Sequence, residues 1–484
     1  MNPISLCIWT TALMLMLVSN STAQDRPVLP QGLSEPPVTE GDPPALPPGL
    51  LQDDAPSLPE GPGDEPTPLD AFPSGIASSP SMPLNVTCYW ELRGGLRTDN
   101  DPHEKQTPLL ESRLQIAGDG QWERVVVKIT ADVIYDGVVA RNRIQLNRGE
   151  GWIDLREANI TFSPTHYMDV KAGRQVMTWG TGDLIFINDL FPKDWNSFFI
   201  GRDEEYLKAP SDAVKVSLFS SAANIDLYYI PVFDHDRYVD GRRVSYWNSS
   251  RNRRSGRNTI VRPLRNNRWF HDFEAGCRLY RNFSGYEIAL YGYTGFWKSP
   301  AGVDRKNFRP TFPDLSVYGG SFRGRLFSGI ANVELGYYDS DDDHSGNNPS
   351  VKNSEIRFLM GYDIELARDF TAVFQYYLEH MRHYAAYRRV LPKSTYPRHR
   401  NRHLITARFT KLLLNQNLSL CLFIYFCPTD SDVYVRTNIT WKVSDSWSVE
   451  TGGNSFYGRH PYTFFGQFEK NSNIYVGIRR YFTY

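Results

Sequence analysis

The stretch Asn473-Ile-Tyr-Val-Gly-Ile-Arg-Arg-Tyr-Phe-Thr-Tyr484 decides the fold. Its apolar residues recur at every second position, with Ile474, Val476 and Ile478 on one face and polar residues between them. This alternation predicts a β-strand with one apolar and one polar face. Because the strand runs to the end of the sequence, we expect it to find its second partner in the first strand of a closed barrel. Arg480 is the exception, since it falls on the apolar face.

The same alternation recurs from residue 84 onward, most clearly in residues 433–443, 355–366 and 273–279. We expect an all-β fold, a transmembrane antiparallel β-barrel of about 18 strands. The expected strands are residues 87–99, 107–118, 122–136, 152–163, 167–179, 212–220, 223–233, 269–281, 284–297, 314–325, 327–340, 353–366, 369–384, 400–412, 416–428, 431–443, 446–457 and 472–484.

The connections between these strands give a second, independent indication. Those after even-numbered strands are short, whereas most of those after odd-numbered strands are long, with the exception near Thr429–Asp430. Bacterial outer-membrane barrels have this asymmetry, with short periplasmic turns and long extracellular loops. A soluble sandwich is disfavoured by the many charges on the polar strand faces. A propeller is disfavoured because no fixed repeat period is found.

Composition narrows the function classes. The formal net charge is −1, which gives no electrostatic reason to expect a nucleic-acid partner. Aromatic residues make up 14% of the chain, which suits the aromatic girdles of a membrane barrel. No GxSxG or HExxH motif occurs, so we expect no enzyme.

Cysteine usage predicts neither a disulfide framework nor a metal site. Beyond residue 23 the cysteines are Cys88, Cys277, Cys421 and Cys427, and no CxxC spacing occurs. Cys421 and Cys427 lie on one expected strand, about 20 Å apart if it is extended, so they cannot bridge within it. We therefore expect no metal and no cofactor.

The N-terminal region has a different character from the barrel. Residues 1–23 read as a signal peptide, with an apolar core and a Ser21-Thr22-Ala23 cleavage site. Residues 24–83 are rich in Pro, Asp and Glu and are expected to form a disordered periplasmic linker. The barrel is then residues 84–484. The linker is either a tether for a periplasmic partner or a spacer without one, and the sequence leaves both open.

The long connection at residues 180–211 is the candidate pore constriction. It combines apolar anchors with charges, which suits a loop that folds into the lumen and packs against the wall. A structured extracellular cap is the alternative. The constriction candidates are Asp183, Asp189, Lys193, Asp194, Arg202, Asp203, Glu204 and Glu205.

A family resemblance runs through the same region. The segments Leu155-Arg-Glu-Ala158, Gly173-Arg-Gln175, Trp179-Gly180 and Asn188-Asp-Leu-Phe-Pro192 resemble a pattern in porin-like proteobacterial outer-membrane barrels. The overall plan is similar to that of the porin and alginate-export barrels. The resemblance implies an outer-membrane barrel and passage of a solute, and it does not define the solute.

Charges of inward parity are the candidate lumen wall. Arg174 has the parity of lipid-facing neighbours, and a bulge at Gly173 would turn it inward, close to Arg156 and Glu157. We interpret that group as an ion-pair cluster bracing the loop. The lumen-wall candidates are Glu157, Arg174, Arg323, Arg325, Arg357 and Arg436.

The connection at residues 234–268 is rich in arginine and is expected to be extracellular. Simple charge attraction would let it recruit anionic solutes or lipopolysaccharide phosphates, although a solvated variable loop is the plainer interpretation. Its candidate residues are Arg242, Arg243, Arg251, Arg253, Arg254 and Arg257.

Together these features predict a porin-type channel in the outer membrane of a Gram-negative bacterium, open to small hydrophilic solutes. Two alternatives remain. One is a barrel scaffold that sheathes or anchors a periplasmic or secreted partner, in a polymer-export or electron-conduit complex. The other is a surface receptor or adhesin that acts through the arginine-rich loop. Expected partners are outer-membrane lipid and lipopolysaccharide, the barrel-insertion machinery through the C-terminal strand, and a periplasmic partner of residues 24–83. A homotrimer is one arrangement that general porin architecture suggests.

Overall fold

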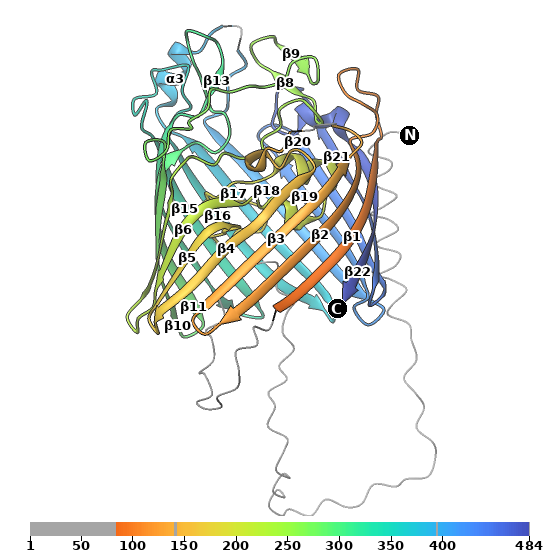
Figure 1. Cartoon of the computed structure of the whole chain (residues 1–484). Helices are drawn as coiled ribbons and strands as arrows, with labels where there is room; N and C mark the ends of the chain where they lie inside the picture. Colours follow the sequence, from red (N-terminus) through yellow and green to blue (C-terminus); the bar gives the residue numbers. More distant parts are fainter. Residues whose placement is uncertain (1–83, 140–142, 394, 484) are drawn as a thin grey trace, which may run out of the picture. The chain divides into compact units, whose positions relative to one another are not determined.

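The computed structural model describes residues 84–139, 143–393 and 395–483 (Figure 1). These residues form an antiparallel β-barrel of 18 strands, in which each strand pairs with the next along the chain. The last strand pairs with the first over eleven residue pairs, from Thr87↔Thr483 to Arg97↔Asn473. The expectation of a closed barrel of about 18 strands is therefore confirmed. The expected signal peptide and linker lie outside the described residues.

The barrel strands follow the alternating segments of the sequence closely. They are β1 (Leu84–Arg97), β2 (Leu109–Trp122), β3 (Val125–Asp136), β4 (Ile153–Thr165), β5 (Met168–Gln175), β6 (Ser211–Leu218), β7 (Asn224–Ile230), β10 (Glu274–Phe283), β11 (Tyr286–Phe296), β14 (Asp314–Leu326), β15 (Gly329–Ser340), β16 (Glu355–Ala367), β17 (Phe370–Met381), β18 (Asn401–Leu413), β19 (Leu418–Cys427), β20 (Asp432–Ser444), β21 (Trp447–Gly458) and β22 (Asn473–Thr483).

Several strands are shorter than their alternation predicts, and β5 and β10 fall furthest short at one end. β5 ends at Gln175 rather than at residue 179, because the chain leaves the wall there. β10 begins at Glu274 rather than at residue 269, because the preceding residues turn back on themselves, with Phe270 at a positive φ of 59°. Alternation identifies a strand but does not report where tertiary contacts end it.

Connections are short at one end of the barrel and long at the other, as expected. The long ones carry the smaller elements, several of which stand together beyond one end of the strands (Figure 1). These elements are η2 (Leu146–Arg148), α2 (Trp195–Ile200), η3 (Glu204–Leu207), β8 (Tyr246–Asn248), β9 (Arg253–Ser255), β12 (Gly302–Val303), β13 (Pro310–Thr311), α3 (Tyr384–Val390) and η4 (Gly466–Asn471). Among the described helices, none is both long and apolar enough to cross a membrane.

The outer face of the wall is an apolar band with aromatic margins. Aliphatic side chains are exposed at mid-strand, such as Ile129, Leu335 and Met360. Exposed aromatic side chains lie near the strand ends, at the short-turn end for Trp122, Phe283, Phe327 and Trp447, and at the long-loop end for Tyr135, Trp152, Phe426 and Tyr457. A membrane barrel presents this pattern to lipid and to its two interfaces.

A charge on this band tests whether it faces lipid. We expect Leu335→Arg, at the middle of β15, to lower the free energy of unfolding in lipid vesicles by about 2–4 kcal/mol, and the matched Leu326→Arg, at the short-turn end of β14, by about 0–1 kcal/mol. Equilibrium unfolding in urea measures both. Equal costs at the two positions would contradict a lipid-facing band.

Candidate functional site: the inward loop

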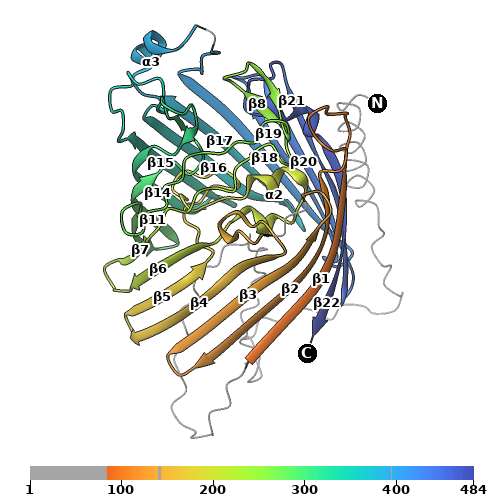
Figure 2. The ribbon, with the colours of Figure 1, turned by 45° about the horizontal axis from the view of Figure 1, so that its top comes forward.

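The connection between β5 and β6 folds into the barrel. We call residues 176–210 the inward loop; its helix α2 lies within the ring of strands (Figure 2). Gly180, at a positive φ of 84°, allows the turn that follows the end of β5. Gln175 and Ser211 remain directly opposed, so the loop leaves and rejoins the wall at one point.

The first half of the loop is held by buried polar groups of the opposite wall. The carboxylate of Glu334, on β15, accepts the backbone N–H of Gly182 at 2.8 Å and the side-chain amide of Asn188 at 2.9 Å. The hydroxyl of Tyr338 donates to the Ile187 carbonyl, and that of Tyr425, on β19, donates to the Leu184 carbonyl at 3.0 Å. These bonds satisfy loop backbone that would otherwise be buried without partners.

Helix α2 is short and is fixed at both ends. Asp194 caps its start by accepting from the Ser197 N–H at 2.8 Å, and Gly201 ends it at a positive φ of 88°. Its buried rings, Phe198 and Phe199, pack against aromatic side chains of the wall. These are Tyr425, Tyr434, Phe456 and, in η4, Phe468.

The turn after α2 is acidic and faces three arginines of the wall. We call Asp203, Glu204 and Glu205 the acidic turn. Arg408 of β18 approaches Glu204 at 2.8 Å, and Arg436 of β20 lies 3.9 Å from the same carboxylate. Arg479 of β22 contacts Asp203 at 2.8 Å and Glu205 at 3.8 Å.

The environment of the acidic turn splits the pKa values of its carboxyl groups. Burial raises the pKa of Glu204, but Arg408 and Arg436 outweigh it and hold that pKa below its usual value. Burial also raises the pKa of Asp203, but the nearby Arg479 outweighs it, so that pKa is lowered as well. The pKa of Glu205 is raised, because burial and the neighbouring Asp203 charge together outweigh Arg479.

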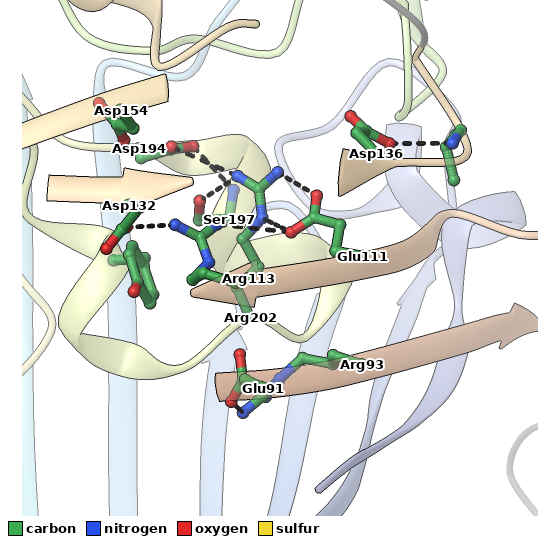
Figure 3. Close-up of polar contacts among 12 residues, drawn as sticks. Glu91, Arg93, Glu111, Arg113, Asp132, Asp136, Asp154, Asp194, Ser197 and Arg202 are labelled. Carbon is green, nitrogen blue, oxygen red and sulfur yellow. Dashed lines mark hydrogen bonds and ion pairs between the residues drawn. The ribbon is translucent and has the colours of Figure 1, made fainter. Parts of the chain in front are cut away.

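A buried ion-pair network joins the loop to β2 and β3 (Figure 3). Its centre is Glu111 of β2, whose side chain is 3% exposed and which contacts three guanidinium groups. Arg202 donates through Nε at 2.9 Å, Arg113 lies 3.4 Å away, and Arg243 lies 3.2 Å away. Arg113 also binds Asp132 of β3.

A second segment, residues 231–245, lies against the inward loop. Arg237 makes a two-pronged contact with Asp154 of β4, both bonds at 2.8 Å, and lies 3.5 Å from Asp194. The Lys193 N–H donates to Asp236 at 2.8 Å. Between this segment, the inward loop and the β3–β4 connection lies a cavity of about 70 Å³ with an unusual density of charge. This cavity is large enough for a few water molecules but is too small to be a pore.

The constriction candidates divide into two groups. Asp183, Asp203, Glu204 and Glu205 have partly exposed side chains, at 25%, 28%, 32% and 42%. Asp189, Lys193 and Asp194 are buried, with Asp189 and Lys193 paired at 2.8 Å, so their roles are structural. The side chain of Arg202 is 12% exposed, and its guanidinium group is paired with Glu111. The first group is partly exposed on the surface of the loop, whereas the second is packed within it.

The prediction that a bulge at Gly173 turns Arg174 into the lumen was wrong. Gly173 has a positive φ of 118°, but the pairing register continues through it without a shift, and the register shift near Arg156 lies in the β3–β4 pairing instead. Arg174 therefore keeps its outward parity and binds Asp212 of β6 at 2.9 Å and the Leu155 carbonyl at 2.7 Å. Arg174 is the last β5 residue that pairs with β4, opposite Ala158, and its side chain reaches along β4 to Leu155, so it braces the wall and does not line the lumen.

The other lumen-wall candidates have inward parity. Glu157 pairs with Lys128 at 2.8 Å, and Arg357 pairs with Glu355 at 2.9 Å and stacks on Tyr338. Arg436 docks the acidic turn, with its guanidinium 4.8 Å from the centre of the Phe198 ring. Arg323 and Arg325 are exposed near the short-turn end of β14.

The arginine-rich connection is not uniformly solvated, which corrects the expectation for half of its candidates. Arg242 pairs with Glu150 at 2.7 Å, Arg243 with Glu111, and Arg254 with Glu469 at 3.0 Å. Arg251, Arg253 and Arg257 are exposed as expected. These three arginines, of which Arg243 is buried and the other two half-buried, pair with carboxylates on segments far away in the sequence.

The central acceptor of the network, Glu111, was missed by sequence reasoning. It shares the parity of Arg113 on β2, so the alternation held the signal that it faces inward. The sequence gives no hint that three arginines surround Glu111, because Arg202 and Arg243 come from two separate loops. Asp154 was missed in the same way.

No protein-family model matches this chain. No curated protein matches it either. Among solved structures, OccAB3 of Acinetobacter baumannii is 9% identical over 83% of this chain and 100% of its own, with a TM-score of 0.49. A BenF-like porin of Pseudomonas fluorescens Pf-5 is 8% identical over 83% and 98%, with a TM-score of 0.48. OccD3 (OpdP) of Pseudomonas aeruginosa is 10% identical over 83% and 91%, with a TM-score of 0.47. The strand register, rather than these likenesses, carries the fold assignment.

Two arginines of the same connection should differ sharply in their effect on stability. Arg243→Ala removes one of the three guanidinium partners of the buried Glu111 carboxylate and the ion-pair partner of the half-buried Asp136, so we expect it to cost about 1–3 kcal/mol of unfolding free energy. The matched Arg253→Ala, at an exposed site, should stay within about 0.5 kcal/mol. Urea unfolding measures both, and an unchanged Arg243→Ala variant would show that the network is not built as described.

The charge of the loop should change with pH. Burial raises the pKa of Asp183 to about 6, against the opposing pull of Arg408 at 3.1 Å. As pH falls through about 6, Asp183 loses its negative charge and Arg408 keeps its positive one. Over this pH range we expect the reversal potential in a salt gradient to move toward the equilibrium potential of the anion, because the channel becomes more anion-selective. In Asp183→Asn that step should vanish; a step of unchanged size in this variant would contradict the assignment.

Proposed function

We propose that this chain is a porin-type channel of a Gram-negative outer membrane, through which small hydrophilic solutes diffuse past the inward loop. One observation carries the proposal: a loop of an 18-stranded barrel lies inside the barrel and is docked on its inner wall. Barrels of 16–18 strands are wide enough to leave an aqueous channel, and an inward loop narrows it. The apolar outer band and its aromatic margins support the membrane location.

The constriction would consist of the exposed side of the inward loop and the wall that faces it. The partly exposed carboxylates of Asp183 and the acidic turn meet Arg408 and Arg479 across short distances. A passing solute would meet both signs of charge, so the constriction orients dipolar and charged solutes instead of repelling one sign outright. The passage is diffusion, and no chemical step is proposed.

The partners follow from this location. We propose contact with membrane lipid and lipopolysaccharide along the outer face, and insertion by the barrel-assembly machinery through the C-terminal strand. A periplasmic partner for residues 24–83 and a homotrimeric assembly also remain proposals.

A surface receptor is the second candidate, and one observation favours it. In the described long connections other than the inward loop, the exposed basic residues far outnumber the exposed acidic ones, which are Asp341 and Asp342. The basic ones are Lys105, Arg143, Arg251, Arg253, Arg257, Arg262, Arg265, Arg268, Arg305, Lys306, Arg309, Arg382, Arg388, Arg389, Lys393, Arg398, Arg400 and Arg459. Binding of an anionic ligand that survives a blocked lumen would favour this candidate.

Replacing the inward loop tests the channel proposal. Because Gln175 and Ser211 are directly opposed, a short Gly-Ser linker can join β5 to β6 in place of residues 176–210. We expect this variant to admit larger sugars than the wild type in a liposome-swelling assay. The matched control removes residues 304–308, at the tip of the β12–β13 hairpin, and should keep the wild-type size limit.

Heat-modifiable migration of each variant on a gel checks that the barrel has formed. A folded loop-replacement variant with the same size limit as the wild type would contradict the claim that the inward loop is the constriction.

A further inference from the structure

The hairpin between β19 and β20 gathers three potential metal ligands at the long-loop end of the barrel. Cys427 ends β19 and is directly opposed to Asp432, which begins β20. Ser431 adopts a positive φ of 52°, which closes the tight connection that holds Asp430. The Cys427 sulfur and one carboxylate oxygen from each aspartate lie within 4.8 Å of one another.

This group differs from an ordinary surface cluster by its burial and by an unsatisfied atom. Cys427 and Asp432 both have 0% of their surface exposed. Asp432 Oδ2 accepts the Phe465 N–H at 2.8 Å, but its Oδ1 is buried without a hydrogen-bond partner. Buried carboxylate oxygens are rarely left without a donor or a cation. The orphaned oxygen therefore indicates that a ligand belongs here.

The charges around the group indicate the kind of ligand. The cation paired with it is Arg402, whose Nε lies 3.0 Å from Asp430 Oδ2. With a neutral thiol, two carboxylates and one guanidinium, the group carries one net negative charge. If the thiol gives up its proton to solvent on binding, the three ligands carry three negative charges, and Arg402 together with a divalent cation balances them.

We propose that Cys427, Asp430 and Asp432 bind a zinc-class divalent cation. A thiolate selects soft or borderline ions over Ca²⁺ and Mg²⁺, and carboxylate oxygens complete a zinc set. Three protein ligands leave a fourth position for water. The bound ion ties the β19–β20 hairpin to the β21–β22 connection, since Phe465 already bonds to Asp432. The exposed group of Asp339, Asp341 and His344 also gathers ligand atoms, but it has no such buried orphan and carries no proposal.

Cadmium titration of the refolded full chain is the test, because a cadmium–thiolate bond gives an ultraviolet charge-transfer band. We expect a band that saturates at one Cd²⁺ per chain and is displaced by Zn²⁺. Cys427→Ser should abolish it, and Asp432→Asn should weaken Cd²⁺ binding by about 10-fold or more. The matched control, Cys421→Ser, alters an inward-facing cysteine of the same strand and should keep the band.

Absence of the band in the wild type would overturn the proposal, as would its survival in Cys427→Ser or its loss in Cys421→Ser. X-ray absorption of the zinc-loaded wild type keeps the test independent of variants that fail to fold. We expect one sulfur and otherwise oxygen neighbours around zinc. A shell without sulfur would also overturn the proposal.

Discussion

The docking of the acidic turn onto Arg408, Arg436 and Arg479 is the interaction on which the inward loop depends. Each of the three carboxylates is partly exposed, so no single pair is strong by itself. Their strength lies in being a connected set that the buried rings of α2 place against the wall. If the loop left the wall, Arg408 and Arg436 would lose their carboxylate partners, Arg479 would keep only Glu91, and the aromatic contacts of Phe198 and Phe199 would be lost as well.

The same network closes the barrel. Arg479 of β22 binds Glu91 of β1 at 3.0 Å, across the junction of the last and first strands. Arg93 of β1 binds Glu450 of β21 and also donates to the Gly201 carbonyl of the inward loop at 2.8 Å. Closure and loop docking therefore share side chains. The inward face of the closed barrel carries the charges that hold the loop.

Much of the barrel could be predicted because strand alternation is a local property. A period of two placed Arg436 on the inner face, and the lengths of the connections distinguished one end of the barrel from the other. The inward path of residues 176–210 was also predictable in outline, since Phe198 and its apolar neighbours need a surface to pack on. Asp194, three residues before Ser197, carried a recognisable helix-capping signal.

The parts that could not be predicted depend on contacts between segments far apart in the sequence. Arg243 is buried because it pairs with Glu111 of β2. Lys193 is buried because it pairs with Asp189 of the same loop. The position of Arg174 could not be predicted either, because it depends on where β5 stops pairing with β4. No local pattern reports these pairings, so only the three-dimensional structure separates the exposed candidates from the buried ones among residues named by charge and parity.

The central claim is that the inward loop narrows a water-filled lumen without filling it. Planar-bilayer recording of the refolded chain lacking residues 1–23 tests this most directly. The account predicts steady channels of uniform size in the wild type. A barrel that is folded and heat-modifiable but electrically silent would contradict it, because the loop would then seal the lumen and the barrel would serve as a scaffold or a receptor.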